Sequence, residues 1–355
     1  MRVMRMGAQG RRLRASVQVT LAWTLAVHVV IVGGACRRSS GGSSAATAAG
    51  QVSSADSSQR AAPSGPVRVP HPLRPGYAEV VVDAARLEKL AARNLAVSVS
   101  LPESLLADRI AAWRQIPTGD RIARWALLFA SRSDNAYCFG PKPGGYVAES
   151  LLVQDYKFDC VLLFYRCTEL ARATSPRRAV FAALETRFAD GDPERVVSPA
   201  GGVDYDAPSH LDYSEDFAAT GLWGRDVTRE VGDAVQESAG TSRYPAGTRW
   251  FIPEERIRYD RLRNGDLLFF VLDERNPGAR KLRDDYGLLV GHQGIVHVDG
   301  GEVRVVHAAA SGLEGLYSGN RVVEVPLRTY LQRLERFKGI FVSRIEDVPT
   351  GAGPR

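Results

Sequence analysis

The stretch "DYKFDCVLLFYRC" places a cysteine where a helix is predicted to begin. Cys160 follows Asp159 directly and opens an apolar run that ends at about Ala173. Unpaired backbone N–H groups and the positive end of the helix dipole stabilise a thiolate at such a position. Cys160 could therefore be a nucleophile, but a core cysteine, half of a disulfide or a metal ligand would also fit this pattern.

A cysteine nucleophile needs a neighbouring base, and histidine is the usual one. The histidines that follow residue 36 are His71, His210, His292, His297 and His307. His292 and His307 flank a "DGG" turn, so paired strands would bring them together. One ring could then take the thiol proton while the other fixes its tautomer. His297 is an odd number of residues from His292 and should face the other side of the strand.

The remaining cysteines constrain one another. If a helix begins at Cys160, Cys167 lies about 10.5 Å further along its axis, whereas a disulfide needs Cα atoms within about 7 Å. Cys138 could pair with either of them, and we favour Cys138–Cys167, which would staple a loop to the helix. The chain contains no CxxC or HxxxH pair, so we expect no metal site and no cofactor.

The elements around these residues change character along the chain. Helical spacing predicts helices over residues 78–96, 101–116, 118–132, 160–173 and 177–191. Short β-branched and aromatic runs predict antiparallel strands over residues 265–273, 292–309 and 339–347, with a helical stretch at 327–337. Residues 192–249 read as long loops with short helices, and the charged segment 273–285 as a lid or solvated loop. Helices followed by an antiparallel sheet indicate an α+β fold.

The first 36 residues are typical of an export signal. Five arginines precede the uncharged apolar run "VQVTLAWTLAVHVVIVGG", and small residues lead to Cys36. The end of this segment, "GGAC", resembles the bacterial lipobox, which makes Cys36 the predicted lipidated residue. Residues 37–67 are rich in Ser, Ala and Gly and predict a disordered tether. We therefore expect an exported lipoprotein, tethered to a membrane of the cell envelope and facing the periplasm.

The net charge gives no support to nucleic-acid binding. The whole chain carries +6, but five of its arginines and none of its acids lie before Cys36. The part that follows the signal is therefore close to +1. A nucleic-acid-binding domain would need a basic patch in the folded part, so nucleic acid is not an expected partner.

The order of the motifs resembles a known family. "FDC" is followed by "NGDLLFF", "HQGIVH" and "VVHAA", a pattern similar to that of the NlpC-type cell-wall hydrolases, which are papain-like cysteine peptidases of bacterial envelopes. "GDRIARWALLF", "GLWGRDVT", "YGLLVGHQGI" and "VEVPLRTYLQRLERFKGIFVSR" resemble the N-acetylmuramoyl-L-alanine amidase-like branch. The resemblance implies a papain-like domain over residues 116–345, a helical N-terminal extension over 68–115 and a disordered tail over 346–355.

Carried over to this sequence, the resemblance implies a role for each motif residue. Cys160 would be the nucleophile, His292 the general base and His307 the orienting residue. Tyr137 would lie on the substrate side near the oxyanion, to which the N–H of Cys160 would donate. We expect Asp159 to cap the helix and Asp266 to fix a turn, because a carboxylate beside the cysteine would raise the pKa of the thiol.

The expected activity is cleavage of an amide bond in peptidoglycan or muropeptides. The resemblance favours an N-acetylmuramoyl-L-alanine amidase. A γ-D-glutamyl–diamino acid endopeptidase of the same fold and a non-catalytic wall-binding lipoprotein are the alternatives. A thiol-dependent acyltransferase or thioesterase on this fold is a further one, and an apolar groove would distinguish it.

Overall fold

The computed structural model describes residues 66–69, 80–96, 101–188, 193–211, 223–238 and 248–347. The chain divides into two units, Met1–Ser64 and Gly65–Arg355, and every described residue belongs to the second. The predicted signal, Cys36, His71, nearly all of the tether and most of the predicted tail lie outside the described residues. Within the described part, no helix is long and apolar enough to span a bilayer.

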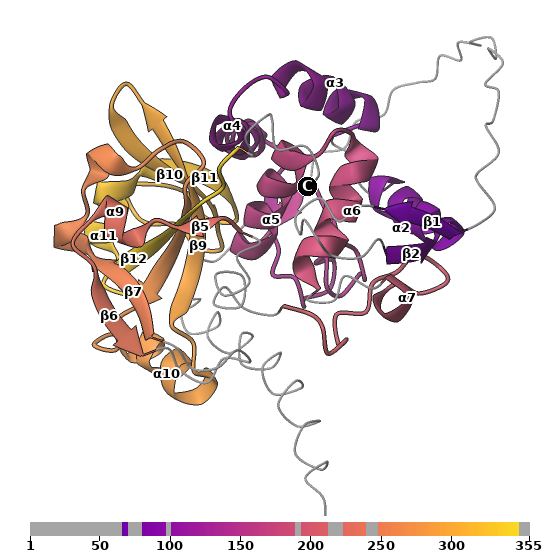
Figure 1. Cartoon of the computed structure of the whole chain (residues 1–355). Helices are drawn as coiled ribbons and strands as arrows, with labels where there is room; N and C mark the ends of the chain where they lie inside the picture. Colours follow the sequence, from indigo (N-terminus) through magenta and orange to yellow (C-terminus); the bar gives the residue numbers. More distant parts are fainter. Residues whose placement is uncertain are drawn as a thin grey trace, which may run out of the picture. The chain divides into compact units, whose positions relative to one another are not determined.

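Helices form the first half of the second unit (Figure 1). They are α2 (Ala84–Ala96), α3 (Glu103–Trp113), α4 (Thr118–Ser131), α5 (Cys160–Arg172), α6 (Pro176–Arg187) and the single turn α7 (Pro193–Val196). The predicted helices at 101–116, 118–132, 160–173 and 177–191 are thereby confirmed, apart from their ends. α5 is the central one, because every residue from Leu162 to Ala171 is buried.

The second half is an antiparallel sheet in the order β11-β10-β9-β8-β12-β7-β6, with β5 paired to β12. Its strands are β5 (Arg225–Asp226), β6 (Val235–Ser238), β7 (Thr248–Pro253), β8 (Leu267–Leu272), β9 (Val290–Asp299), β10 (Glu302–Ala309), β11 (Arg321–Pro326) and β12 (Phe337–Arg344). The short elements α9 (Thr228–Val231), η1 (Glu254–Arg256), η2 (Tyr259–Arg261), α10 (Pro277–Tyr286) and α11 (Leu327–Arg333) connect them. The predicted α+β class is confirmed.

Strand β8 is the centre of the core because both of its faces are covered. All six residues of "LLFFVL" are buried, as an uninterrupted apolar run predicts. On one face, Phe269 packs 5.2 Å from Phe164 of α5, measured between ring centroids. On the other face, Phe270 lies 5.4 Å from Tyr330 of α11. The sheet is thus held between the α5 layer and the short helix α11.

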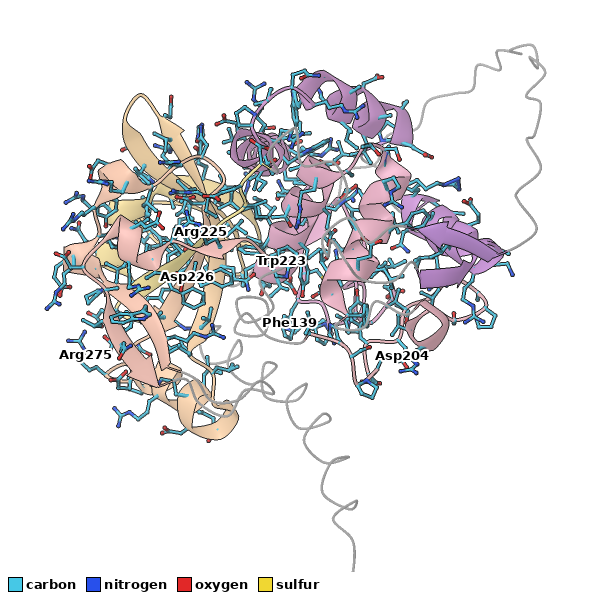
Figure 2. The ribbon with its side chains drawn as sticks, in the orientation of Figure 1. Phe139, Asp204, Trp223, Arg225, Asp226 and Arg275 are labelled. Carbon is cyan, nitrogen blue, oxygen red and sulfur yellow. The ribbon has the colours of Figure 1, made fainter. Side chains whose placement is uncertain are left out.

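Trp223 closes the boundary between the helices and the sheet, as Figure 2 shows. Its ring lies 5.5 Å from Phe164 and 5.1 Å from Tyr165 of α5. The hydroxyl of Ser343 on β12 donates to its backbone carbonyl. An aromatic side chain of this size buries a large apolar area, so Trp223 fixes the position of α5 against β12.

Two buried ion pairs tie α5 to the surrounding chain. Arg166 donates from Nε and Nη2 to the two oxygens of Asp155 at 2.5 and 2.9 Å, with both side chains fully buried. Arg187 of α6 binds both oxygens of Glu169 at 2.9 Å in the same bidentate manner. Because bidentate geometry is directional, these pairs set the rotation of α5 about its axis, and with it the direction in which its first turn faces.

The predicted N-terminal boundaries are wrong at two places. Residues 80–83 were expected to begin a helix, but they form strand β2 (Val80–Asp83), paired with β1 (Pro66–Val69). β-branched valines favour extended backbone, and "VVVD" therefore stays out of α2. Strand β1 also begins inside the predicted tether, which was expected to run to residue 67.

The charged segment 273–285 is largely a helix and not a loop. Asn276 caps α10 by accepting from the N–H groups of Gly278 and Ala279, and Pro277 occupies the first helical position. Gly287 ends α10 in the left-handed conformation, with φ of 66°. Residues 192–249 contain the predicted short helices, but they also contribute β5, β6 and the start of β7 to the sheet.

Removing Arg166 should leave the buried carboxylate of Asp155 uncompensated. We expect Arg166→Met to lower the free energy of unfolding by about 3–5 kcal/mol. The double variant Asp155→Leu/Arg166→Met should regain most of this loss, because it replaces the pair with apolar groups. Urea denaturation followed by circular dichroism measures both. A double variant less stable than the single one would contradict this account.

Candidate active site

The candidate nucleophile is the first residue of α5, and Asp159 caps the helix in front of it. Oδ1 of Asp159 accepts from the N–H of Leu162 at 2.7 Å, and Oδ2 accepts from the N–H of Gly140 at 2.9 Å. The predicted capping role of Asp159 is confirmed. The same carboxylate also joins the loop after residue 138 to the helix start, so Cys160 sits in a fixed turn.

Tyr137 reaches this turn through a short parallel pairing of strands. Strand β3 (Ala136–Tyr137) pairs with β4 (Lys157–Phe158), which leads directly into the capped turn. The N–H of Tyr137 donates to the carbonyl of Asn320 at 3.0 Å. Burial raises the pKa of the Tyr137 phenol well above its usual value, and the neighbouring Cys160 adds to the shift. Tyr137 is therefore a protonated hydroxyl beside the thiol at neutral pH.

The structure brings His292 and His307 together as the sequence predicted. Nε2 of His292 lies 3.0 Å from Nδ1 of His307. The antiparallel register pairs Ile295 with Val306, so one step further His307 falls opposite Gly294, two residues from His292 on the same face. With His292 as the donor in this contact, its Nδ1 is left unprotonated, as a base requires.

His297 points to other partners, as predicted. Its Nδ1 lies 2.6 Å from Oε1 of Glu324 on β11. Arg304 binds the same carboxylate at 3.1 Å. His297 therefore belongs to a polar cluster on the opposite face of β9 and takes no part in the His292–His307 pair.

Strand β9 connects the histidine pair to the cysteine. The backbone N–H of Gln293, the residue after His292, donates to Cys160. A hydrogen bond to the sulfur favours the thiolate. Cys160 is thus held by the residue that follows the candidate base on β9.

Electrostatics at the site favour neutral groups. Burial raises the pKa of the Cys160 thiol to about 12, and the charge of Asp159 contributes further. Burial also lowers the pKa of His292 well below its usual value and that of His307 to about 3. The helix start alone was expected to stabilise a thiolate, but desolvation outweighs it. At rest the pair is therefore a thiol and a neutral imidazole, and proton transfer must accompany attack by the sulfur.

Two residues of this site carried no signal in the sequence. Tyr330 on α11 has its ring centroid 4.7 Å from that of His307, and it interacts electrostatically with Cys160. Arg336, just before β12, interacts with Cys160, Tyr137 and Tyr330. The segment "LRTYLQRLERF" reads only as a helix, since neither its spacing nor its composition marks these two side chains.

The predicted disulfide is not present. Cys138, Cys160 and Cys167 are all free thiols. Cys138 lies beside the residues that precede α5, because its N–H donates to the carbonyl of Phe158 at 3.0 Å. Cys167 is buried two turns further along the helix, about 10.5 Å from its start, which is beyond disulfide range. Cys167 is a core residue.

Asp266 fixes a turn, as expected. Its Oδ2 accepts from the N–H of Arg263 at 2.9 Å immediately before β8. Arg344 of β12 binds both of its oxygens at 2.7 Å.

In the described part of the chain, no group of three or more His, Cys, Asp or Glu side chains could hold a metal ion.

Comparison with known proteins identifies similarity in structure only. No family model matches the sequence, and neither does any curated protein. The Legionella pneumophila protein LPG0564, described as DUF1460, superposes with a TM-score of 0.53 at 16% identity, over 72% of this chain and 97% of that one. An N-acetylmuramoyl-L-alanine amidase from Bacteroides uniformis gives a TM-score of 0.46 at 17% identity, over 65% and 99%. The chain therefore shares the fold of the Legionella protein.

The buried histidines should make the protein less stable in acid. Because the folded pKa of His307 is about 3 and its unfolded value is about 6.5, the unfolded state binds more protons between these pH values, and stability falls as the pH drops through this window. We expect His307 to account for about 2 kcal/mol of the loss between pH 7 and pH 5. Urea denaturation of His307→Gln at both pH values should show a loss smaller by that amount. An unchanged loss would show that His307 titrates normally.

Proposed function

We propose that the protein is a cysteine-dependent hydrolase that cleaves an amide bond in peptidoglycan or muropeptides. The observation that carries the proposal is the placement of Cys160, at a capped helix start and hydrogen-bonded by the strand that presents the His292–His307 pair. A core cysteine would need none of these partners. The fold shared with the DUF1460 protein of Legionella is consistent with this function but does not by itself identify a substrate.

In the proposed reaction, His292 takes the proton of Cys160 as the sulfur attacks the amide carbonyl. The oxyanion of the tetrahedral intermediate accepts hydrogen bonds from the N–H of Cys160 and the hydroxyl of Tyr137. The C–N bond then breaks, and His292 returns the proton to the leaving amine. Water, activated by His292, hydrolyses the thioester and restores the thiol. His307 holds the ring of His292 throughout.

The finer assignment is the bond between muramic acid and L-alanine. Its support is the sequence resemblance to the amidase-like branch, which is carried by "GDRIARWALLF", "GLWGRDVT", "YGLLVGHQGI" and the C-terminal "VEVPLRTYLQRLERFKGIFVSR". Cleavage of the γ-D-glutamyl–diamino acid bond is the alternative. The two activities release different products from one muropeptide, a free peptide in the first case and a shortened muropeptide in the second, so mass spectrometry distinguishes them.

Hydrolysis of purified muropeptides under reducing conditions tests the proposal. We expect Cys160→Ala and His292→Ala to lower kcat/KM by at least about 10⁴-fold, and His307→Ala by about 10²–10⁴-fold. His297→Ala is the matched control, because it removes a histidine from the same strand on the opposite face, and should keep activity within about threefold. Full activity of Cys160→Ala would refute a cysteine mechanism. Binding of muropeptides without turnover by the wild type would favour the wall-binding alternative.

We also propose that the protein is exported and lipidated at Cys36. The support is the basic, apolar and "GGAC" order of the first 36 residues, and the Ser/Ala/Gly-rich segment that follows would serve as the tether. Expressed in a bacterium, the wild type should partition into the detergent phase of Triton X-114. Cys36→Ser should shift it to the aqueous phase or leave an uncleaved precursor. Equal partitioning and equal size of both forms would count against lipidation.

A further inference from the structure

Arg336 is a cation without a carboxylate partner beside the candidate nucleophile. Its Nε is buried and has no hydrogen-bond partner among the described residues. The acids next to it, in the chain or across from it at the end of β8, are engaged elsewhere or exposed. Asp273 binds Arg275, Glu274 binds Lys338 and Arg283, and Glu335 is exposed. No described carboxylate therefore compensates the guanidinium.

The contacts of Arg336 do not account for its placement. Its Cζ lies 5.8 Å from the ring centroid of Phe337, a distance at which a cation–π contact is weak. Such a contact offsets only a small part of the cost of withdrawing a guanidinium from water. Phe337 in turn stacks on His292, with centroids 6.2 Å apart and ring planes at 15°. The cation is thus fixed next to the histidine pair.

The side chains around Arg336 are uncharged, and they include the candidate nucleophile. It interacts electrostatically with His292 of β9 and with three groups from α11, α5 and β3, which are Tyr330, Cys160 and Tyr137. All three are neutral at pH 7 because burial raises the pKa of each. An arginine that lies near the nucleophile and is surrounded by neutral groups is suited to bind an anionic group of the substrate.

We propose that Arg336 binds a carboxylate of the substrate next to the scissile amide, so that the site selects peptides containing a γ-linked glutamate with a free α-carboxylate. This inference rests on the proposed function. A glutamate joined through its γ-carboxyl keeps its α-carboxylate, and this group lies within a few bonds of either candidate scissile bond. α-Amidation replaces the anion with a neutral group of the same shape. The amidated substrate should therefore be hydrolysed poorly.

A pair of muropeptides that differ only in this α-amidation tests the selection. Wild type should prefer the free acid by about 10–100-fold in kcat/KM, as expected for a charged hydrogen-bonding partner. Arg336→Gln should abolish the preference, so that the ratio of kcat/KM for the acid to kcat/KM for the amidated substrate falls to about 1. This ratio cancels any effect of the lost cation on the Cys160 thiol, because both substrates share it. Arg336→Lys should retain part of the preference, since lysine keeps the charge without the bidentate fork. Arg333→Gln, on exposed α11 surface three residues earlier, is the control and should behave like wild type.

Alkylation of Cys160 tests the same inference without turnover. Iodoacetate and iodoacetamide are nearly isosteric and differ in the carboxylate. The rate constants for alkylation of Cys160 are measured by peptide mass spectrometry at pH 9. We expect the ratio of the iodoacetate rate constant to the iodoacetamide rate constant to fall about tenfold from wild type to Arg336→Gln. The same ratio should be unchanged in Arg333→Gln. If neither muropeptide is hydrolysed but this ratio falls, the proposed function fails and the anion site stands. If the ratio is the same in all three proteins, Arg336 does not bind carboxylates and the inference is overturned.

Discussion

The candidate site depends on one carboxylate that serves two parts of the chain. Asp159 caps α5 through the N–H of Leu162 and holds the preceding loop through the N–H of Gly140. Without it, the first turn of α5 would lose a partner for an orphan backbone donor, and the loop that follows Tyr137 would lose its link to the helix. Asp159 therefore adds to the β3–β4 pairing in holding Cys160 and Tyr137 in place relative to each other. The cost is electrostatic, because the same charge opposes ionisation of the thiol.

Burial gives the site its second property, the neutrality of its titratable groups. The packing that brings β9 against α5 removes water from Cys160, His292 and His307 together. The thiol then keeps its proton, and the imidazoles stay uncharged. Such a pair differs from a preformed thiolate–imidazolium pair because charge separates only as a bond forms. In the proposed reaction, the low polarity of the site would strengthen the action of fixed donors such as the N–H of Cys160 on the oxyanion.

Local signals in the sequence predicted the parts of the site that depend on neighbours in the chain. The Asp–Cys step before an apolar run located the cap. The "DGG" turn paired His292 with His307, and the odd spacing from His292 placed His297 on the opposite face. The apolar run of β8 and the helical spacing of α4 to α6 gave the fold class. Helix α10, which Asn276 caps and Gly287 ends, was missed, because the charged composition of residues 273–285 favours a lid or a solvated loop.

What the sequence did not reveal depends on contacts between distant segments. Tyr330 and Arg336 join the site only because α11 folds back over β8 and β9, and no spacing rule relates them to Cys160. The sequence could not show that Cys138 and Cys167 are free thiols. That depends on the loop of Cys138 meeting the first turn of α5, whereas Cys167 lies two turns further along the helix. The short strands β5 and β6 lie in polar sequence and are held by pairing with β12 and β7, a tertiary effect that outweighs local propensity.

The order of the elements along the chain has a consequence for biogenesis. Cys160 is synthesised about 130 residues before His292, and the N–H that holds its sulfur belongs to the same late strand. Contacts between such distant segments form late in folding because loop closure must come first. A partly made polypeptide therefore contains the cysteine helix without the strand that completes it. In the proposed reaction, this arrangement delays hydrolytic competence until the last third of the chain has folded.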